Sequence, residues 1–148
     1  MTPTPIAREL YDAYRSTRYI AWIDGEAVVL RVGSANQVLA ALMAAHGVSA
    51  GCFVTGFNPY SKIGDRAVNA AANARLQSVL LDAGYLVFEA EGRALDDAWP
   101  AEPSYLVLGC CRQDALGLCM AFDQNAVLCF GADATPEIVL HPHLEKPQ

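Results

Sequence analysis

Two runs rich in β-branched and aromatic residues, Arg18–Ile23 and Glu26–Val32, are separated only by Asp24 and Gly25. An Asp-Gly pair at this spacing favours a type I′ turn, in which both central residues adopt a positive φ. This is the clearest local signal in the chain. It predicts a β-hairpin, so the fold has to contain a sheet with antiparallel strands.

Four segments carry helical signals. The first helix is predicted to begin at Thr4 as N-cap, with Pro5 at the first helical position, and to run to about Tyr14. Its apolar stripe comprises Ile6, Leu10, Ala13 and Tyr14. The second helix is predicted to open with a capping box of Ser34 and Gln37 and to stop at Gly47. The other two are expected over about 65–83, closed by Gly84, and over about 112–122.

Further strands alternate with these helices. They are predicted over Cys52–Phe57, Tyr85–Ala90, Tyr105–Cys110, Ala126–Phe130 and Glu137–Leu140, with a loop over residues 91–103. The order indicates an α+β fold with α/β character: a mixed sheet of about six to seven strands with helices packed on it. The chain of 148 residues is expected to be one domain, with frayed ends at 1–4 and 141–148.

Composition excludes several classes of protein. Hydrophobic residues make up 53 % of the chain and charged residues 18 %, which is incompatible with a disordered protein. The net charge of −6 argues against nucleic acid and anionic membranes as partners. Neither a secretory signal nor an apolar run long enough to span a bilayer is recognisable, so we expect a cytoplasmic protein.

The five cysteines, Cys52, Cys110, Cys111, Cys119 and Cys129, show no spacing typical of a zinc site or a redox motif. Four of them lie in apolar segments, where cysteine usually behaves as a small buried hydrophobic residue. Reduced thiols in a cytoplasmic protein are the simplest interpretation. No metal and no cofactor is predicted.

The predicted topology brings three loops together. If the strands over 26–32, 52–57 and 85–90 run in the same direction, their carboxyl ends share one edge of the sheet. The strand over 105–110 then runs back from that edge, and the strand over 126–130 starts there. Segments 58–62, 91–102 and 123–125 should therefore meet at one rim, with Ser34 and the turn over 15–18 close by. Ligands of open α/β sheets commonly bind at such a rim.

Asn58 and Lys62 lie in the first rim segment, which leads into a helix N-terminus. The free N–H groups expected there, together with Lys62, are suited to a phosphate or carboxylate. The alternative is an Asn-Pro turn, capped by Ser61 or Asp65, with Lys62 in solvent. No glycine-rich phosphate loop is present.

Asn69 and Asn73 fall on or beside the apolar face of the long helix, where an unpaired amide is costly. They either clamp the neighbouring loops or bind the polar edge of a ligand. Arg75, on the opposite flank, pairs with an anionic group or lies in solvent. Gln124 begins a buried strand, where it either caps the preceding helix or completes the pocket.

The segment over 91–103 contains the most candidate chemistry. Pro100 and Pro103 stiffen the backbone around Trp99 and Glu102. Trp99 is either an aromatic wall of a site or an anchor packed on the core, and Glu102 is the candidate general acid or base. The acids Glu91, Asp96 and Asp97 offer a Mg²⁺ site, but acids scattered through a loop more often face water.

Several short motifs occur in a characteristic order. They are Tyr14…Tyr19, Thr55-Gly-Phe-Asn58-Pro59, Asn73-Ala-Arg75-Leu76, Gly92…Trp99-Pro-Ala-Glu102-Pro-Ser104 and Phe122-Asp-Gln124-Asn-Ala126. Together they resemble a small bacterial family known only as a domain of unknown function, number 3293 in that series. Gly56 stands where this family suggests alanine, and Asp123 where it suggests glycine. The resemblance implies a stand-alone cytoplasmic domain and no established reaction. Its pattern falls on Asn58, Asn73, Trp99, Glu102 and Gln124.

Two functions follow as hypotheses. The first is a rim site for a polar small molecule, such as a nucleotide-like or anionic metabolite, in which Asn58, Lys62, Asn73, Arg75, Trp99 and Gln124 bind the ligand. If the domain is an enzyme, Glu102 acts as its acid or base. The second is a non-catalytic acidic module (an adaptor, regulator or immunity-type protein) that binds a basic protein partner. A purely structural role of the rim residues is a third interpretation. Both a monomer and a homodimer are compatible with the sequence.

Overall fold

The computed structural model describes residues 2–97 and 99–148; Met1 and Ala98, which fall in the predicted N-terminal tail and the predicted 91–103 loop, lie outside them. The elements follow in the order β1 (Thr4–Pro5), α1 (Arg8–Ser16), β2 (Arg18–Ile23), β3 (Glu26–Leu30), α2 (Gln37–Ala45), β4 (Gly51–Val54), the 3-10 turn η1 (Pro59–Ser61), α3 (Arg66–Asp82), β5 (Leu86–Arg93), β6 (Glu102–Leu108), α4 (Arg112–Ala121), β7 (Ala126–Phe130), β8 (Glu137–Leu140) and β9 (Leu144–Glu145).

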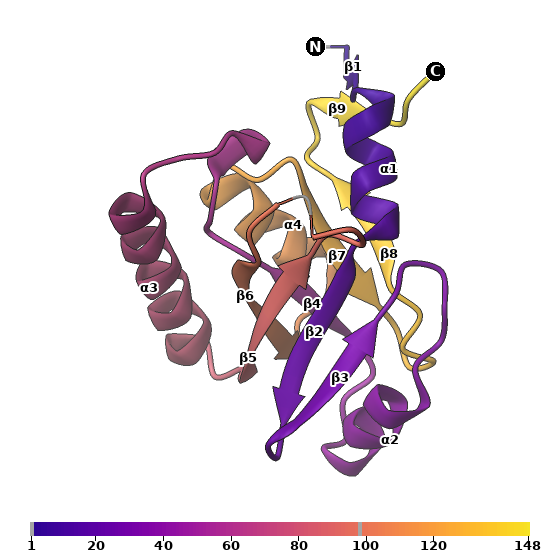
Figure 1. Cartoon of the computed structure of the whole chain (residues 1–148). Coiled ribbons are helices and arrows are strands. Elements are labelled where there is room, and N and C mark those ends of the chain that lie inside the picture. The colour runs from indigo at the N-terminus through magenta and orange to yellow at the C-terminus, as the bar shows by residue number, and fades with distance from the viewer. Residues whose placement is uncertain (1, 98) are drawn as a thin grey trace.

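The main sheet has seven strands in the order β3-β2-β5-β6-β4-β7-β8, and each neighbouring pair is antiparallel (Figure 1). The expected α+β class and strand number are confirmed. The strands expected to be parallel, β3, β4 and β5, do run in one direction, but antiparallel strands separate them. They end at the same edge of the sheet, and β2, β6 and β7 begin there. We call this edge the rim.

The strongest local signals of the sequence are found where they were expected. Asp24 and Gly25 have φ values of 52° and 81°, as a type I′ turn requires, and they join β2 to β3. Helix α3 begins after Asp65, whose Oδ1 accepts hydrogen bonds from the backbone N–H groups of Ala67 and Val68 at 2.9 and 3.1 Å. It ends before Gly84, with a φ of 84°.

The two ends of the chain differ from the prediction. Helix α1 begins at Arg8 and not after Thr4, because Thr4–Pro5 forms strand β1, which pairs in parallel with β9 at Leu144–Glu145. The segments predicted to fray, 1–4 and 141–148, thus contribute residues to this small sheet. No local sequence pattern predicts this small sheet, because its two strands lie about 140 residues apart in the chain.

The cap of α2 is also different. Asn36, not Ser34, is the N-cap, and its Oδ1 accepts a hydrogen bond from the Leu39 N–H at 2.9 Å. Its Nδ2 donates to the carbonyl of Val29 at 3.1 Å, which ties the helix to the hairpin. A serine hydroxyl cannot make both bonds in this arrangement as readily, because it has one donor hydrogen on a shorter side chain.

Strands β5 and β6 extend into the segment predicted as loop. Their register pairs Glu91 with Pro103 and Gly92 with Glu102. Glu102 therefore stands on the first residue of a strand, and not in a loop.

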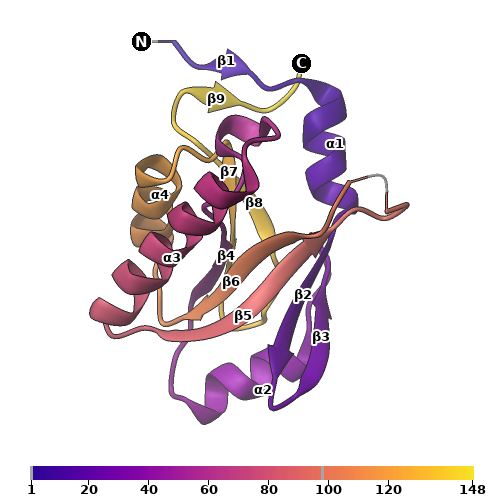
Figure 2. The same cartoon turned by 60° about the vertical axis from the view of Figure 1, so that its left-hand side comes forward.

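Helices cover the two faces of the sheet unequally (Figure 2). One face packs on α3 and α4 through Leu76, Leu80, Leu118 and the buried Cys52, Cys110, Cys119 and Cys129. The other face packs on α2 through Leu39 and Met43. Helix α2 lies at the end of the sheet away from the rim, while α1 lies near the rim. Near the rim, α1 therefore replaces α2 as the neighbour of this face. None of the helices in the described part of the chain has the length and apolar character needed to cross a membrane.

Two glycines provide a matched test of the backbone. Gly25 needs a positive φ, whereas Gly117 lies inside α4 with open space around its Cα. Replacing Gly25 by Ala should lower the free energy of unfolding by roughly 1–2 kcal/mol. Gly117→Ala should raise it by roughly 0.5–1 kcal/mol, because glycine loses more backbone entropy in a helix. Urea denaturation measures both changes, and a Gly25→Ala protein as stable as the wild type would contradict the turn assignment.

Candidate functional site

The three loops predicted to share the rim do meet there. The side-chain amide of Asn58 donates from Nδ2 to Oε2 of Glu102 at 3.0 Å. The backbone N–H of Tyr60 donates to the carbonyl of Asp123 at 2.7 Å. Helix α1, which precedes β2, joins them, since the Tyr14 hydroxyl is hydrogen-bonded to Ser61 Oγ. The convergence inferred from strand directions is therefore confirmed.

Asn58 organises the first loop. Its Oδ1 accepts hydrogen bonds from the Gly64 N–H at 3.0 Å and from Asn69 Nδ2 at 2.7 Å, while its own N–H donates to Asn69 Oδ1 at 3.0 Å. Because Oδ1 of Asn58 is held by Asn69 of α3 and by the Gly64 N–H, Nδ2 of the same amide points toward Glu102. The backbone is left-handed at Asn58, Tyr60 and Ser61, which is costly for residues with a side chain and needs such support.

Asn73 and Gln124 act as clamps on the backbone. Asn73 accepts from the Gly56 N–H at 2.7 Å and donates to the Pro103 carbonyl at 3.0 Å. Gln124 Nε2 donates to the carbonyls of Phe57 and Phe122, both at 3.1 Å. Both side chains are buried, so of the two roles considered for Asn73 the structural one is realised. Gln124 holds the loop after β4 as well as the end of α4.

Glu102 is a half-buried carboxylate with an unused oxygen. Its Oε2 accepts the Asn58 bond, whereas Oε1 accepts no hydrogen bond from the residues that the structure describes. Burial raises the pKa of Glu102 above its usual value, and the Asn58 hydrogen bond partly opposes this. The carboxylate is therefore held in place by one donor and lacks a partner on its other side.

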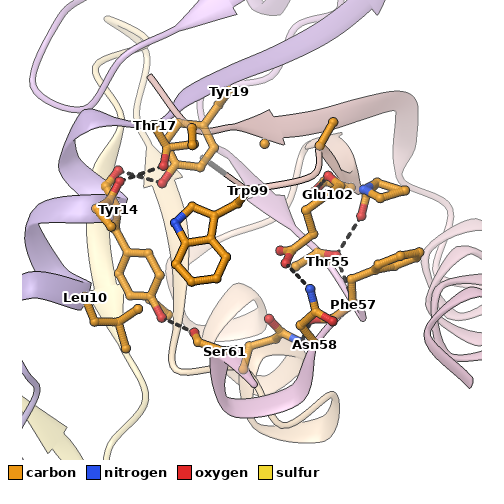
Figure 3. A pocket seen from close by; sticks show the side chains of 18 of the residues that line it. Leu10, Tyr14, Thr17, Tyr19, Thr55, Phe57, Asn58, Ser61, Trp99 and Glu102 are labelled. Carbon is orange, nitrogen blue, oxygen red and sulfur yellow. Dashed lines mark hydrogen bonds between the residues drawn. The ribbon is translucent and has the colours of Figure 1, made fainter. Parts of the chain in front are cut away.

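A cavity of about 720 Å³ opens beside Glu102, a volume typical of sites for small organic molecules. Its floor continues the core on the α2 face of the sheet and includes Tyr19, Phe53, Leu128 and Ile138. Figure 3 shows Glu102, Asn58, Trp99 and Tyr14 around this space. We call it the rim cavity.

Helix α1 forms one wall of the rim cavity. Leu10, Ala13 and Tyr14 line it, and no residue of α1 is buried. The helix is attached through Tyr14 to Ser61, and the Tyr19 hydroxyl donates to the Tyr14 carbonyl at 2.7 Å. Tyr14 is partly buried, and this partial burial raises the pKa of its hydroxyl. Three of the four residues of the predicted apolar stripe, Leu10, Ala13 and Tyr14, therefore line a cavity, whereas Ile6 lies before the helix and is buried.

Sequence reasoning missed this wall. The apolar stripe of the first helix was predicted, but not which part of the protein it faces, while Ser34 and the turn over residues 15–18 were expected near the rim. The spacing of apolar residues predicts which face of a helix turns away from water, and it does not show whether that face meets a packed core or a cavity.

Trp99, Lys62 and Arg75 lie in different surroundings. Trp99 lines the cavity and is 58 % exposed, so it is not an anchor packed on the core. Lys62 and Arg75 are exposed, and neither lines the rim cavity. Of the seven predicted site residues, Asn58, Trp99, Glu102 and Gln124 line it, whereas Lys62, Asn73 and Arg75 do not.

The predicted anion pocket at residues 55–62 is absent from the described chain. The N–H groups of residues 56, 57, 58, 60, 61 and 62 all donate within the protein, and Asp65 occupies the start of α3. The alternative interpretation, an Asn-Pro turn before an Asp65-capped helix with Lys62 in solvent, is the one that the structure supports.

Glu91 and Asp97 of the 91–97 segment are paired with arginines. Glu91 Oε2 accepts from Arg93 Nη2 at 2.8 Å, and Asp97 Oδ1 accepts from Arg18 Nη2 at 3.2 Å. Among residues 2–97 and 99–148, no group of three or more His, Cys, Asp or Glu side chains is arranged to hold a metal ion.

The clamp role of Asn73 can be measured. Asn73→Ala leaves the buried Gly56 N–H and the Pro103 carbonyl without this partner and should lower the free energy of unfolding by about 1–3 kcal/mol. The control is Arg75→Ala, at an exposed position of the same helix, for which a change within about 0.5 kcal/mol is expected. Equal stabilities of the two variants in urea denaturation would refute the clamp.

The raised pKa of Glu102 predicts a pH dependence of stability. A carboxyl group whose pKa is higher in the folded than in the unfolded chain stabilises the fold below its ordinary pKa, and this contribution is lost as the pH rises through the raised value. Glu102→Gln keeps an acceptor for Asn58 and carries no charge. The stability of the variant relative to wild type should therefore be greater at pH 7.5 than at pH 4. A difference that does not change with pH would disprove the assignment.

Comparison with known proteins adds one finding. A family model described as "Protein of unknown function (DUF3293)" matches residues 54–127, half of the chain. The matched region runs from the end of β4 to the start of β7 and contains Asn58, Trp99 and Glu102. No curated protein and no solved structure matches the chain significantly. With this match and the order of its motifs, the chain belongs to the DUF3293 family.

Proposed function

We propose that this protein binds a small polar organic molecule in the rim cavity, with Glu102 as the group that binds its polar part. One observation carries the proposal: a half-buried carboxylate stands at the wall of a largely apolar cavity with one oxygen free of protein partners. Burying a carboxylate costs free energy unless it is hydrogen-bonded. A ligand that donates to Oε1 would remove this cost.

The surroundings of Glu102 support a binding role over a purely structural one. Polar side chains with a structural role usually have all their hydrogen-bonding atoms engaged, as the oxygen and the nitrogen of the Asn58 amide are. The Asn58 bond fixes the orientation of Glu102 without satisfying it. Trp99 adds an exposed aromatic surface at the same cavity.

Of the ligand types expected from the sequence, an anionic metabolite has the least support. The cations proposed to bind it, Lys62 and Arg75, do not line the cavity, and the N–H groups of the loop are already engaged. That Glu102 serves as a general acid or base stays a prediction. We also propose a cytoplasmic location, since the five cysteines are free thiols, which persist in reducing compartments.

A thermal-shift screen of the purified protein against polar metabolites tests the proposal. A ligand at 100 times its Kd should stabilise the fold by about 2.7 kcal/mol. Ala13→Phe, which places a ring in the cavity from α1, should abolish the response, whereas Ala74→Phe, at an exposed position of α3, should keep it.

Two results would overturn this function. One is a response that persists unchanged in Ala13→Phe, since the ligand would then bind elsewhere. The other is no response to any compound, which would favour the alternative, an acidic module that binds a basic protein partner.

A further inference from the structure

The negative charge of Glu102 has no positively charged partner in the described lining of the rim cavity. The charged residues among its described lining are Glu9, Arg66 and Glu102, and the first two are exposed. Among the described residues, neither Arg66 nor another cation forms an ion pair with Glu102. The carboxylate therefore faces the cavity as an uncompensated negative group.

A further cation at the rim, Arg18, is engaged elsewhere through its Nη2. Arg18 begins β2 at the same rim, but its Nη2 donates to the carbonyl of Ala94 at 3.1 Å and to Asp97 Oδ1 at 3.2 Å. Arg18 does not line the cavity either. Among the described residues, Arg18 therefore holds the 94–97 turn in place and forms no ion pair with Glu102.

Aromatic rings contribute to the lining of the rim cavity. Tyr14 and Trp99 lie beside it and Tyr19 and Phe53 form part of its floor, where these two rings pack edge to face with centroids 5.2 Å apart. Ring faces carry partial negative charge and attract both flat apolar groups and cations. The walls and the carboxylate therefore favour the same kind of ligand.

We infer that the ligand of the rim cavity is an organic cation with a flat apolar body, whose N–H groups donate to Glu102 Oε1 while its body lies against the aromatic walls. This inference rests on the function proposed above and narrows it to one chemical class. An amine or amidine satisfies the unused carboxylate oxygen and supplies the missing positive charge. An anion of the same shape would be repelled by Glu102 and find its donors engaged.

Three probes that share a benzene ring and differ in charge test this: benzamidine (a cation), benzamide (neutral) and benzoate (an anion). Each is titrated into the ¹⁵N-labelled protein at pH 7.5, and the amide signals of the lining residues report binding. Benzamidine should bind more tightly than benzoate by about tenfold or more, the factor that roughly 1.4 kcal/mol represents. Benzamide should lie between them.

Glu102→Gln provides the matched variant, because Gln keeps the shape and an acceptor for Asn58. Its affinity for benzamidine should fall by about tenfold, the loss expected for a charge-assisted hydrogen bond, while its affinity for benzamide should change little. Glu26→Gln is the control, at an exposed carboxylate at the start of β3, the end of the strand away from the rim. It should bind all three probes like the wild type.

The outcomes separate the two proposals. If benzoate binds as tightly as benzamidine, or Glu102→Gln keeps its benzamidine affinity, the cation inference is wrong. The binding function then survives only if Ala13→Phe abolishes the signals. If no probe shifts the lining signals, both proposals fail for this class of ring compound. Should Glu102→Gln not fold, the ranking of the three probes on the wild type decides the question alone.

Discussion

The amide of Asn58 connects the parts of the molecule that make up the rim. Its oxygen is held by α3 and by residue 64, its backbone N–H by Asn69, and its nitrogen donates to Glu102 on β6. Because an amide has one acceptor and one donor end, fixing the oxygen fixes where the nitrogen points. The orientation of Glu102 thus depends on α3.

The hydrogen bonds around Asn58 also explain how the Glu102 carboxylate, whose burial costs free energy, is kept at the cavity wall. A half-buried carboxylate with a raised pKa opposes folding at neutral pH, and the three left-handed residues at 58, 60 and 61 add strain. The clamps from Asn73 and Gln124 and the two apolar cores offset these costs. Proteins usually retain such costs where a ligand or a reaction benefits from them.

Much of the fold could be predicted from local patterns, since the Asp24-Gly25 turn and the Asp65 cap are encoded by neighbouring residues. Strand directions then placed Asn58, Glu102 and Gln124 at one edge before any contact was known. Lys62 and Arg75 were misplaced because a positive charge in a sequence does not show which way its side chain points. The pairing of β1 with β9, and with it the true start of α1, depends on residues at opposite ends of the chain and leaves no local trace.

Helix α1 contributes a wall to the cavity while burying none of its own residues, and it is tied down mainly by hydrogen bonds at Tyr14 and by the β1–β9 pairing beside Ile6. Neither of the two buried apolar clusters includes a residue of α1. The position of this wall is therefore set by the two ends of the chain and by the Tyr14 hydrogen bonds, whereas the positions of Asn58 and Glu102 are set by the sheet and by α3.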